Sequence, residues 1–340
     1  MRVAIIAPPW VAVPPPAYGG TEAVLHSLAA GLAEAGHDVL LHATGDSRCP
    51  VERTSTFPAA LGVGVGGTVA EVRHVIEGYE AARLWGADVV HDHTLVGPLY
   101  GEWFDDVTVL TTNHGPFDSD LGALYRAIGE HVGVIAISRD HAASAGGTPI
   151  AAVIHHGVDV EAFPSGDGDG GYALFLGRMS PDKGVADAAR SARAAGVPLR
   201  IAAKMHEPAE RDYFDVCVRP LLGGGVDYVG EVGGEEKLAL LAEATCLLNP
   251  IRWREPFGMV MIEALACGTP VIATPCGAAP EIVDDGVTGY LRSCQTGLVE
   301  ALASVPALDR DACRRAAKER FSAARMVDDH VAVYERSLRC

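Results

Sequence analysis

Short runs of β-branched and apolar residues alternate with helical patterns along the whole chain, and no other feature limits the fold as strongly. Strand, helix and strand in this order predict parallel sheets joined by right-handed crossovers. In the first half, helical patterns at 21–35 and 69–84 separate the strand-like runs. These runs cover residues 3–7, 39–43, 89–91, 107–112, 134–137 and 152–154.

The alternation stops at residues 163–171, which are polar and rich in glycine, and then starts again. Such a stretch packs no core, so we expect a linker there. We therefore predict an α/β fold of two Rossmann-like, doubly wound parallel-sheet domains, at 1–162 and 172–322, with a ligand cleft between the carboxyl ends of their strands. The second set of strand runs covers 172–176, 199–203, 226–229, 245–249 and 271–273.

The composition of the chain argues against several classes of binding partner and location. The net charge is -17, from 27 basic and 44 acidic residues, and it argues against nucleic acid or an anionic membrane, which need a broad basic face. The eight cysteines form no CxxC pair, which indicates reduced thiols in a cytoplasmic protein. The N-terminus reaches Pro8 too soon for a signal peptide, and no apolar run approaches about 18 residues, so we expect a soluble protein without membrane spans.

One segment of the second half has the features of a phosphate site. It follows the strand run at 245–249 and opens a helix near Phe257. The amides of Gly258, Met259 and Val260 would then be the first of that helix, and a helix N-terminus attracts phosphate oxygens. Glu263 would lean back toward this end and reach a ribose beside the phosphates.

Two cations follow the first strand run of the second half. Arg178 ends that run, and Lys183 comes five residues later in a tight loop. A charged strand end and a surface lysine would explain them separately. Together with a nearby helix N-terminus, they would give a diphosphate both charge and amide donors.

The segment Glu255-Pro-Phe-Gly, followed by Glu263-Ala-Leu-Ala-Cys-Gly-Thr-Pro-Val, resembles the signature of the family 4 retaining glycosyltransferases. Three further stretches resemble motifs of the same family: Tyr-Gly-Gly-Thr-Glu at 18–22, His-Gly-Val-Asp-Val-Glu-Ala-Phe at 156–163 and Leu-Gly-Arg-Met-Ser-Pro-Asp-Lys-Gly at 176–184. The resemblance runs from the first strand to about Leu291. It implies the GT-B fold, with a C-terminal helix at 323–340 that packs back on the first domain.

The resemblance also implies roles for the second-domain residues. Arg178 and Lys183 would neutralise the leaving diphosphate, Glu255 would contact the transferred sugar, and Glu263 would hold the ribose. The base would meet backbone in the loop after the strand run at 226–229. The complete set of donor residues expected in this domain is Gly177, Arg178, Lys183, Gly230, Val232, Glu255, Gly258, Met259, Val260 and Glu263.

In the first domain the resemblance points to a glycine loop and a histidine. Gly19 and Gly20 would let backbone approach the phosphates. His114 stands where the family places a histidine near the donor sugar, although a lone histidine is usually structural. Ser138 matches another family position, but a helix N-cap explains it equally well.

The reaction that the resemblance implies is hexosyl transfer with retention of anomeric configuration and without a metal ion or other cofactor. UDP is the expected nucleotide, ahead of GDP and TDP. The sugar and the acceptor stay open, with a small molecule or an oligosaccharide as the expected acceptor class. The short, acidic, alanine-rich chain is similar in style to actinobacterial transferases of antibiotic pathways, such as that of avilamycin.

Several motifs imitate other sites. The glycine patterns at 62–67 and 166–171 lack the strand-then-helix context of a dinucleotide fingerprint. Asp118 with Asp120, and Asp167 with Asp169, imitate a DxD metal motif, and the second pair lies in the expected linker. His91 and His93 offer two zinc ligands with no evident third, so a polar strand end is the simpler interpretation.

Residues 251–254, Ile-Arg-Trp-Arg, depart from the small residue that often precedes Glu-Pro-Phe-Gly in the family. This bulky cationic loop leaves the donor sugar and the acceptor open. A nucleotide-sugar 2-epimerase of the same architecture and a non-catalytic nucleotide-sugar-binding protein are the alternatives. An NAD-dependent enzyme is disfavoured by the misplaced glycine motifs.

Overall fold

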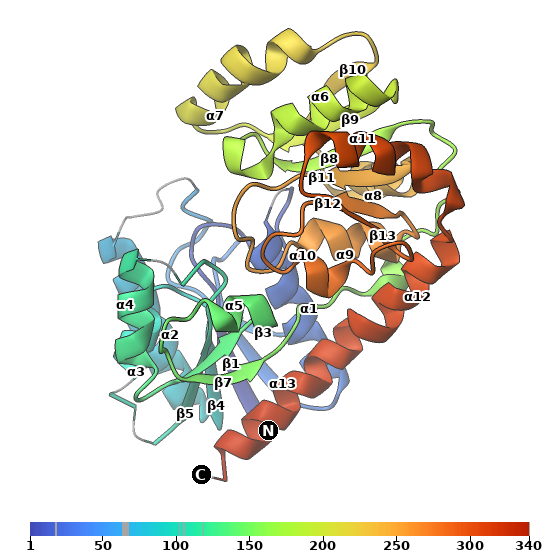
Figure 1. Cartoon of the computed structure of the whole chain (residues 1–340). Helices are drawn as coiled ribbons and strands as arrows, with labels where there is room; N and C mark the ends of the chain where they lie inside the picture. The colour runs from blue at the N-terminus through green and yellow to red at the C-terminus, as the bar shows by residue number, and fades with distance from the viewer. Residues whose placement is uncertain (18, 63–67, 102, 105, 118, 340) are drawn as a thin grey trace. The chain divides into compact units, whose positions relative to one another are not determined.

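The structure is a computed structural model that describes residues 1–17, 19–62, 68–101, 103–104, 106–117 and 119–339. The chain divides into two compact units. Unit 1 combines Met1–Gly157 with Ala323–Cys340, and unit 2 is Val158–Ser322. Each unit is an α/β body with its own sheet (Figure 1).

In the described part of unit 1, seven parallel strands form a sheet in the order β3-β2-β1-β4-β5-β6-β7. Helices α2 and α4 pack over one face, and α1 packs against the C-terminal helix α13. The strands are β1 (Arg2–Ile6), β2 (Asp38–His42), β3 (Glu52–Thr54), β4 (Val89–Asp92), β5 (Thr108–Thr112), β6 (Gly133–Ala136) and β7 (Ile150–Val153). The helices are α1 (Gly20–Glu34), α2 (Thr68–Trp85), α3 (Gly97–Gly101), α4 (Ser119–Ile128), α5 (Arg139–Ala143) and α13 (Ala323–Ser337).

Unit 2 contains six parallel strands in the order β10-β9-β8-β11-β12-β13. The strands are β8 (Ala173–Arg178), β9 (Leu199–Lys204), β10 (Val226–Gly230), β11 (Cys246–Asn249), β12 (Val271–Ala273) and β13 (Gly289–Leu291). The α-helices are α6 (Val185–Ala195), α7 (Pro208–Tyr213), α8 (Gly234–Glu243), α9 (Met259–Ala266), α10 (Ala279–Ile282), α11 (Gln295–Ser304) and α12 (Arg310–Arg320). Short 3-10 or π turns cover η1 (Val160–Ala162), η2 (Pro181–Lys183), η3 (Phe214–Val218), η4 (Arg219–Leu221) and η5 (Val305–Ala307).

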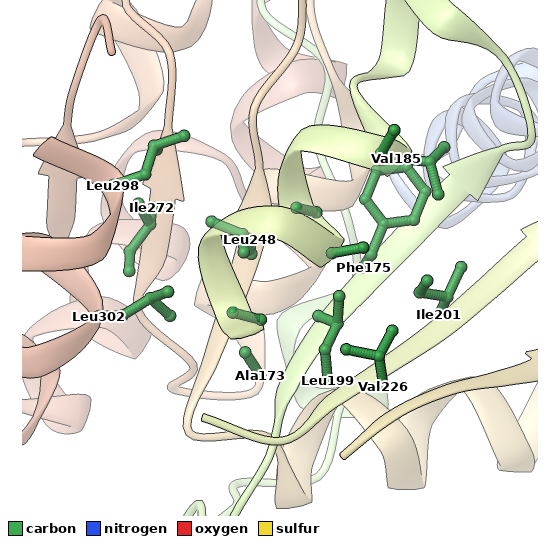
Figure 2. Packing of buried hydrophobic residues seen from close by; sticks show 14 of the residues in the cluster. Ala173, Phe175, Val185, Leu199, Ile201, Val226, Leu248, Ile272, Leu298 and Leu302 are labelled. Atoms are coloured by element: carbon green, nitrogen blue, oxygen red, sulfur yellow. The ribbon is translucent and has the colours of Figure 1, made fainter. Parts of the chain in front are cut away.

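The core of unit 2 depends on small side chains. Helix α6 turns buried alanines toward the sheet, and the fully buried Phe175, Leu199 and Ile201 fill the space beside it (Figure 2). Because alanine adds little volume, the helix lies close to the strands at the density typical of protein interiors. Helix α11 packs against α6, and its Leu298 and Leu302 extend the same core over Ile272.

The predicted α/β class and the two Rossmann-like sheets are confirmed. The sequence did not indicate β3 or β13, since each has three residues and lies at a sheet edge. The helix expected near Phe257 begins at Met259, because Gly258 has a φ of +100°, which no helix accommodates. None of the described helices combines the length and apolar character needed to span a bilayer.

The glycine-rich segment 163–171, expected to be a linker, lies inside unit 2. Its backbone is held there: the Gly166 amide donates to the Cys267 carbonyl at 3.0 Å, and the Gly170 amide donates to the Glu243 carbonyl at 3.0 Å. A Cβ on Gly166 would lie 2.0 Å from the Ala242 carbonyl oxygen. The glycines therefore allow close backbone packing, and the division between the units falls earlier, after Gly157.

Candidate active site

Two loops at the carboxyl ends of β8 and β11 are packed against each other in unit 2. Gly184 has a φ of +76°, and a Cβ there would lie 1.9 Å from the Pro250 carbonyl oxygen. The Arg252 amide donates to the Asp182 carbonyl at 2.7 Å. Only glycine permits this approach, so the sequence Lys183-Gly184 fixes the lysine beside the loop that carries Glu255.

Lys183, Glu255 and Trp253 form one interacting group. The Lys183 ammonium pairs with Glu255 Oε2, and the side chains are only 15% and 13% exposed. Trp253 Nε1 donates to the same oxygen at 2.8 Å, and Lys183 Nζ lies 5.2 Å from the centroid of the Trp253 ring. A charge-assisted hydrogen bond and a cation–π contact thus hold the lysine in place.

A third loop supports the backbone of Glu255. The Ala278 amide donates to the Glu255 carbonyl at 3.0 Å. Gly277, with a φ of +61°, lies so close that a Cβ there would meet the same carbonyl oxygen at 2.2 Å. The Cys276 thiol also donates to the Trp253 carbonyl at 2.9 Å. Loops from β8, β11 and β12 therefore converge on one carboxylate and its lysine.

Arg178 ends β8 beside a second cation that ends β9, Lys204, its partner in the strand register. Both cations approach Glu210 Oε1, Arg178 Nε at 4.0 Å and Lys204 Nζ at 3.7 Å. Arg178 also pairs with Asp182 at 3.0 Å. Glu210 is buried, and its other oxygen accepts from the amides of residues 206 and 207. One fixed carboxylate therefore holds two neighbouring cations at the strand ends.

Glu263 lies in the second turn of α9 and is buried. Its Oε1 accepts from Lys237 Nζ of α8 at 2.9 Å. Met259 and Val260 form the first turn of α9, whose leading amides have no acceptor within the helix. The carboxylate is thus held by a lysine of the preceding helix.

The segment expected near the base follows β10. Gly230 ends the strand with a φ of +94°, and Val232 is buried. Between them Glu231 pairs with His206 Nε2 at 2.5 Å. In the sheet order, β10 is separated from β8 by β9.

Unit 1 carries the remaining predicted residues. Gly19 is the N-cap of α1, and a Cβ there would lie 2.6 Å from Pro15 Cβ, so the loop requires glycine. Gly20 is the first residue of α1. His114 follows β5, and its Nε2 lies 2.9 Å from His93 Nδ1. The hydroxyl of Ser138 accepts from the His141 amide at 2.9 Å, which is the N-cap geometry.

His114 belongs to a cluster of five histidines in unit 1, of which four are buried and His114 itself is half-buried. Neighbouring rings lie close: the centroids of His91 and His93 are 4.0 Å apart, those of His114 and His156 are 5.2 Å apart, and those of His91 and His330 are 5.3 Å apart. Burial lowers the pKa of His114 to about 3 and that of His330 to about 4. Burial also holds the pKa values of His91, His93 and His156 well below the ordinary value. These imidazoles are therefore neutral near pH 7.

Known proteins similar to this chain identify its family. Residues 18–162 match the model described as Glycosyltransferase Family 4, and residues 170–305 match the model described as Glycosyl transferases group 1. AviGT4, a glycosyltransferase involved in avilamycin A biosynthesis, is 30% identical with a TM-score of 0.77, over 100% of this chain and 98% of its own. The chain belongs to glycosyltransferase family 4. It is a transferase of the GT-B type.

Two other proteins are similar to this transferase. A phosphatidyl-myo-inositol mannosyltransferase of Propionibacterium freudenreichii is 29% identical in an alignment 332 residues long, which covers 85% of this chain and 82% of that protein. The Anabaena protein HepE, in a crystal structure with UDP-glucose, is 18% identical with a TM-score of 0.77 and covers 99% of this chain and 100% of its own. At this level of identity, the similarity to HepE shows that the two proteins share a fold.

His91, one of the two candidate zinc ligands, is held by structural contacts. His91 uses both ring nitrogens, on the Tyr334 hydroxyl at 2.7 Å and the Thr112 hydroxyl at 2.8 Å. Asp118 and residues 63–67 lie outside the described residues. Across the described ranges, no group of three or more His, Cys, Asp or Glu side chains is arranged to hold a metal ion.

Three residues of unit 2 contact the predicted site residues or their partners but were not predicted from the sequence. They are Lys204, Lys237 and Trp253. Lys204 is the last residue of a strand run beside the one that ends at Arg178, and that position was its only signal. Trp253 belongs to the loop that departs from the family pattern, and it holds Glu255 by a direct hydrogen bond. Lys237 lies on a helical pattern, and nothing near it in the sequence indicates that it meets Glu263.

Replacing Lys204 with methionine should raise the Kd for UDP about 10-fold, since a charge-assisted contact to a diphosphate would be lost beside Arg178. Methionine keeps the length of the side chain, so the strand end should stay packed. Isothermal titration calorimetry measures the change. Lys318→Met is the matched control, because Lys318 is exposed and pairs with Glu161 on the surface of the same unit; equal losses in both variants would contradict a specific role for Lys204.

Proposed function

We propose that this transferase moves a hexosyl group from a nucleotide sugar, UDP-linked in the first instance, to an acceptor hydroxyl, with retention of configuration and without a metal ion. The observation that carries the proposal is the packing of the β8 and β11 loops, which joins Lys183 to Glu255. Arg178 and Lys204 at neighbouring strand ends supply further positive charge in the same unit. The relative AviGT4 supports a small natural-product acceptor.

Bond breaking at the anomeric carbon places negative charge on the β-phosphate, so the main task is to stabilise that charge. On donor binding, Lys183 would exchange Glu255 for the diphosphate. Glu255 would then be free to accept from hydroxyls of the transferred sugar while Trp253 holds it. Two pre-positioned groups thus change partners, with little reorganisation of the loops.

The proposed transfer step needs no nucleophile from the enzyme. The acceptor oxygen forms the new bond to the anomeric carbon on the face from which the phosphate oxygen departs. The hydroxyl proton passes to that phosphate oxygen, and the nucleoside diphosphate leaves. His114, neutral because burial lowers its pKa to about 3, would act by hydrogen bonding to the sugar and not as a cation.

A thermal-shift screen with UDP, GDP, TDP and NADH tests the donor class. A ligand that binds only the native state raises Tm, and at 100 times its Kd it adds about 2.7 kcal/mol of stability. We expect UDP to give the largest shift. A shift with NADH alone would overturn the proposal.

A second assay separates transfer from the alternative activities. Free UDP should appear from a UDP-sugar only when an acceptor is added. An epimerase would convert the sugar without any acceptor, and a binding protein would show a Tm shift without turnover. Either result would replace transfer as the function.

A further inference from the structure

Unit 1 contains a cavity of about 190 Å³ where β1, β4 and β5 end. One water molecule needs only about 10–15 Å³ of such space, so the cavity has room for a ligand of several non-hydrogen atoms. His114 lines it together with side chains from α1, α2 and α4. All of the described residues that line it belong to unit 1.

Two buried carboxyl groups line the cavity. Glu22, in the first turn of α1, is 7% exposed, and Glu71, in the first turn of α2, is 4% exposed. Glu71 Oε1 accepts from the Leu95 amide at 2.9 Å. Neither carboxyl group forms an ion pair with any residue that the structure describes, and burial raises the pKa of Glu22 to about 7. Buried acids without a cationic partner are rare in proteins.

The positive charge needed by an anionic ligand is missing from this lining. Among its described residues there is no lysine or arginine, and burial keeps His93 and His114 neutral by lowering their pKa values. Glu22 and Glu71 already occupy the positive ends of their helices. A phosphate or carboxylate in the cavity would meet acids in place of cations.

Two further side chains in the lining have polar groups that could bind a polar ligand. His93 Nε2 and Asn113 Nδ2 are buried without a hydrogen-bond partner among the described residues, and both side chains line the cavity. His93 is 6% exposed and Asn113 is 1% exposed. Asn113 Oδ1 already accepts from the Gly115 amide at 2.9 Å, so its NH₂ group is available. Ligand hydroxyls would satisfy both groups.

We propose that this cavity binds the acceptor, and that the acceptor is a monosaccharide or cyclitol unit that carries a protonated amine and no phosphate or carboxylate. The ammonium would pair with Glu71 and Glu22, and hydroxyls would meet Asn113 and His93. The inference rests on the proposed transfer reaction, because it assigns the substrate class of that reaction. The amine is a recognition group, and a hydroxyl of the same ring receives the sugar.

The test is a calorimetric binding series on the full chain. The amine 2-deoxystreptamine is compared with myo-inositol and myo-inositol 1-phosphate, and glucosamine with N-acetylglucosamine. We expect each amine to bind at least about 10-fold more tightly than its neutral counterpart, and the phosphate not to bind. Equal or tighter binding of myo-inositol or its phosphate, or no binding of either amine, would overturn the inference.

Variants assign the preference to the acids. Glu71→Gln and Glu22→Gln keep the shape of the side chains and should reduce the preference for amines to less than about 2-fold. Glu77→Gln on the exposed side of α2 is the matched control and should leave it intact. A preference that persists in both acid variants refutes the assignment. Should the variants fail to fold, the wild-type series still decides.

The outcome is separable from that of the donor proposal. The series is run without nucleotide, so a failure of UDP to raise Tm sinks the donor assignment and leaves the acceptor result readable. Conversely, UDP binding together with binding of neutral or phosphorylated rings sinks only the inference about the acceptor.

Discussion

The Lys183→Ala variant is expected to lose about 10²-fold or more in kcat. Lys183 would contact the charge that develops on the β-phosphate, and removal of one such donor typically costs 10²-fold to 10³-fold. Since the contact strengthens in the transition state, kcat should fall with kcat/KM. Steady-state assay of UDP release measures both constants.

Its matched control is Lys318→Ala, which removes an exposed lysine from the same unit. Circular dichroism and thermal melting must first show that both proteins are folded, because Glu255 loses its ion pair in the Lys183 variant. An unchanged kcat in a folded Lys183 variant would count against the role of this residue and against the proposed stabilisation of the leaving group.

The second large effect is loss of stability below about pH 6.5. The unfolded chain binds protons on histidine near pH 6.5, whereas in the folded state His114 and His330 bind them only near pH 3 and 4. Their contribution is therefore complete above pH 6.5 and is lost as the pH falls. Each net proton costs about 1.4 kcal/mol per pH unit.

Other groups set the net slope. Among the described residues, nine histidines have lowered pKa values. Glu22 and Asp92, whose pKa values burial raises to about 7, act in the opposite direction but are only two. Urea unfolding from pH 7 to 5 should show a steep fall in the free energy of unfolding. A flat profile would show that the cluster accepts protons while folded.

A pair of variants locates the effect. His330→Gln can still donate to the Met326 carbonyl, which His330 Nδ1 contacts at 2.7 Å, and it should reduce the slope by about one proton. His131 is exposed, and His131→Gln is the matched control. The difference between the two slopes measures the buried group directly.

Local patterns in the sequence were sufficient to predict most strands and to recognise the family. The runs that became β1, β8 and β11 are apolar and buried on both faces, so their composition alone marks them. Glu255 and Glu263 were recognisable because a conserved-looking family motif surrounds both. Edge strand β3 carries Glu, Arg and Thr, and its pairing depends on β2 rather than on its own residues.

The contacts that give the candidate site its geometry depend on packing between distant segments. Gly184 meets Pro250, and Lys237 meets Glu263, only after the sheet has formed. The cavity in unit 1 combines Glu22, Glu71 and Asn113, which come from three separate segments. No local spacing relates these residues, so their association could be seen only in three dimensions.

Helix α13 has a consequence for biosynthesis. Its residues Met326, Val327 and Tyr334 are buried in unit 1, where Tyr334 meets His91 and Val327 lies against Gly31 of α1. A ribosome therefore completes all of unit 2 before unit 1 receives its last helix. Until α13 is added, the apolar surface of α1 that it covers stays exposed on the nascent chain, and such transiently exposed surface favours aggregation.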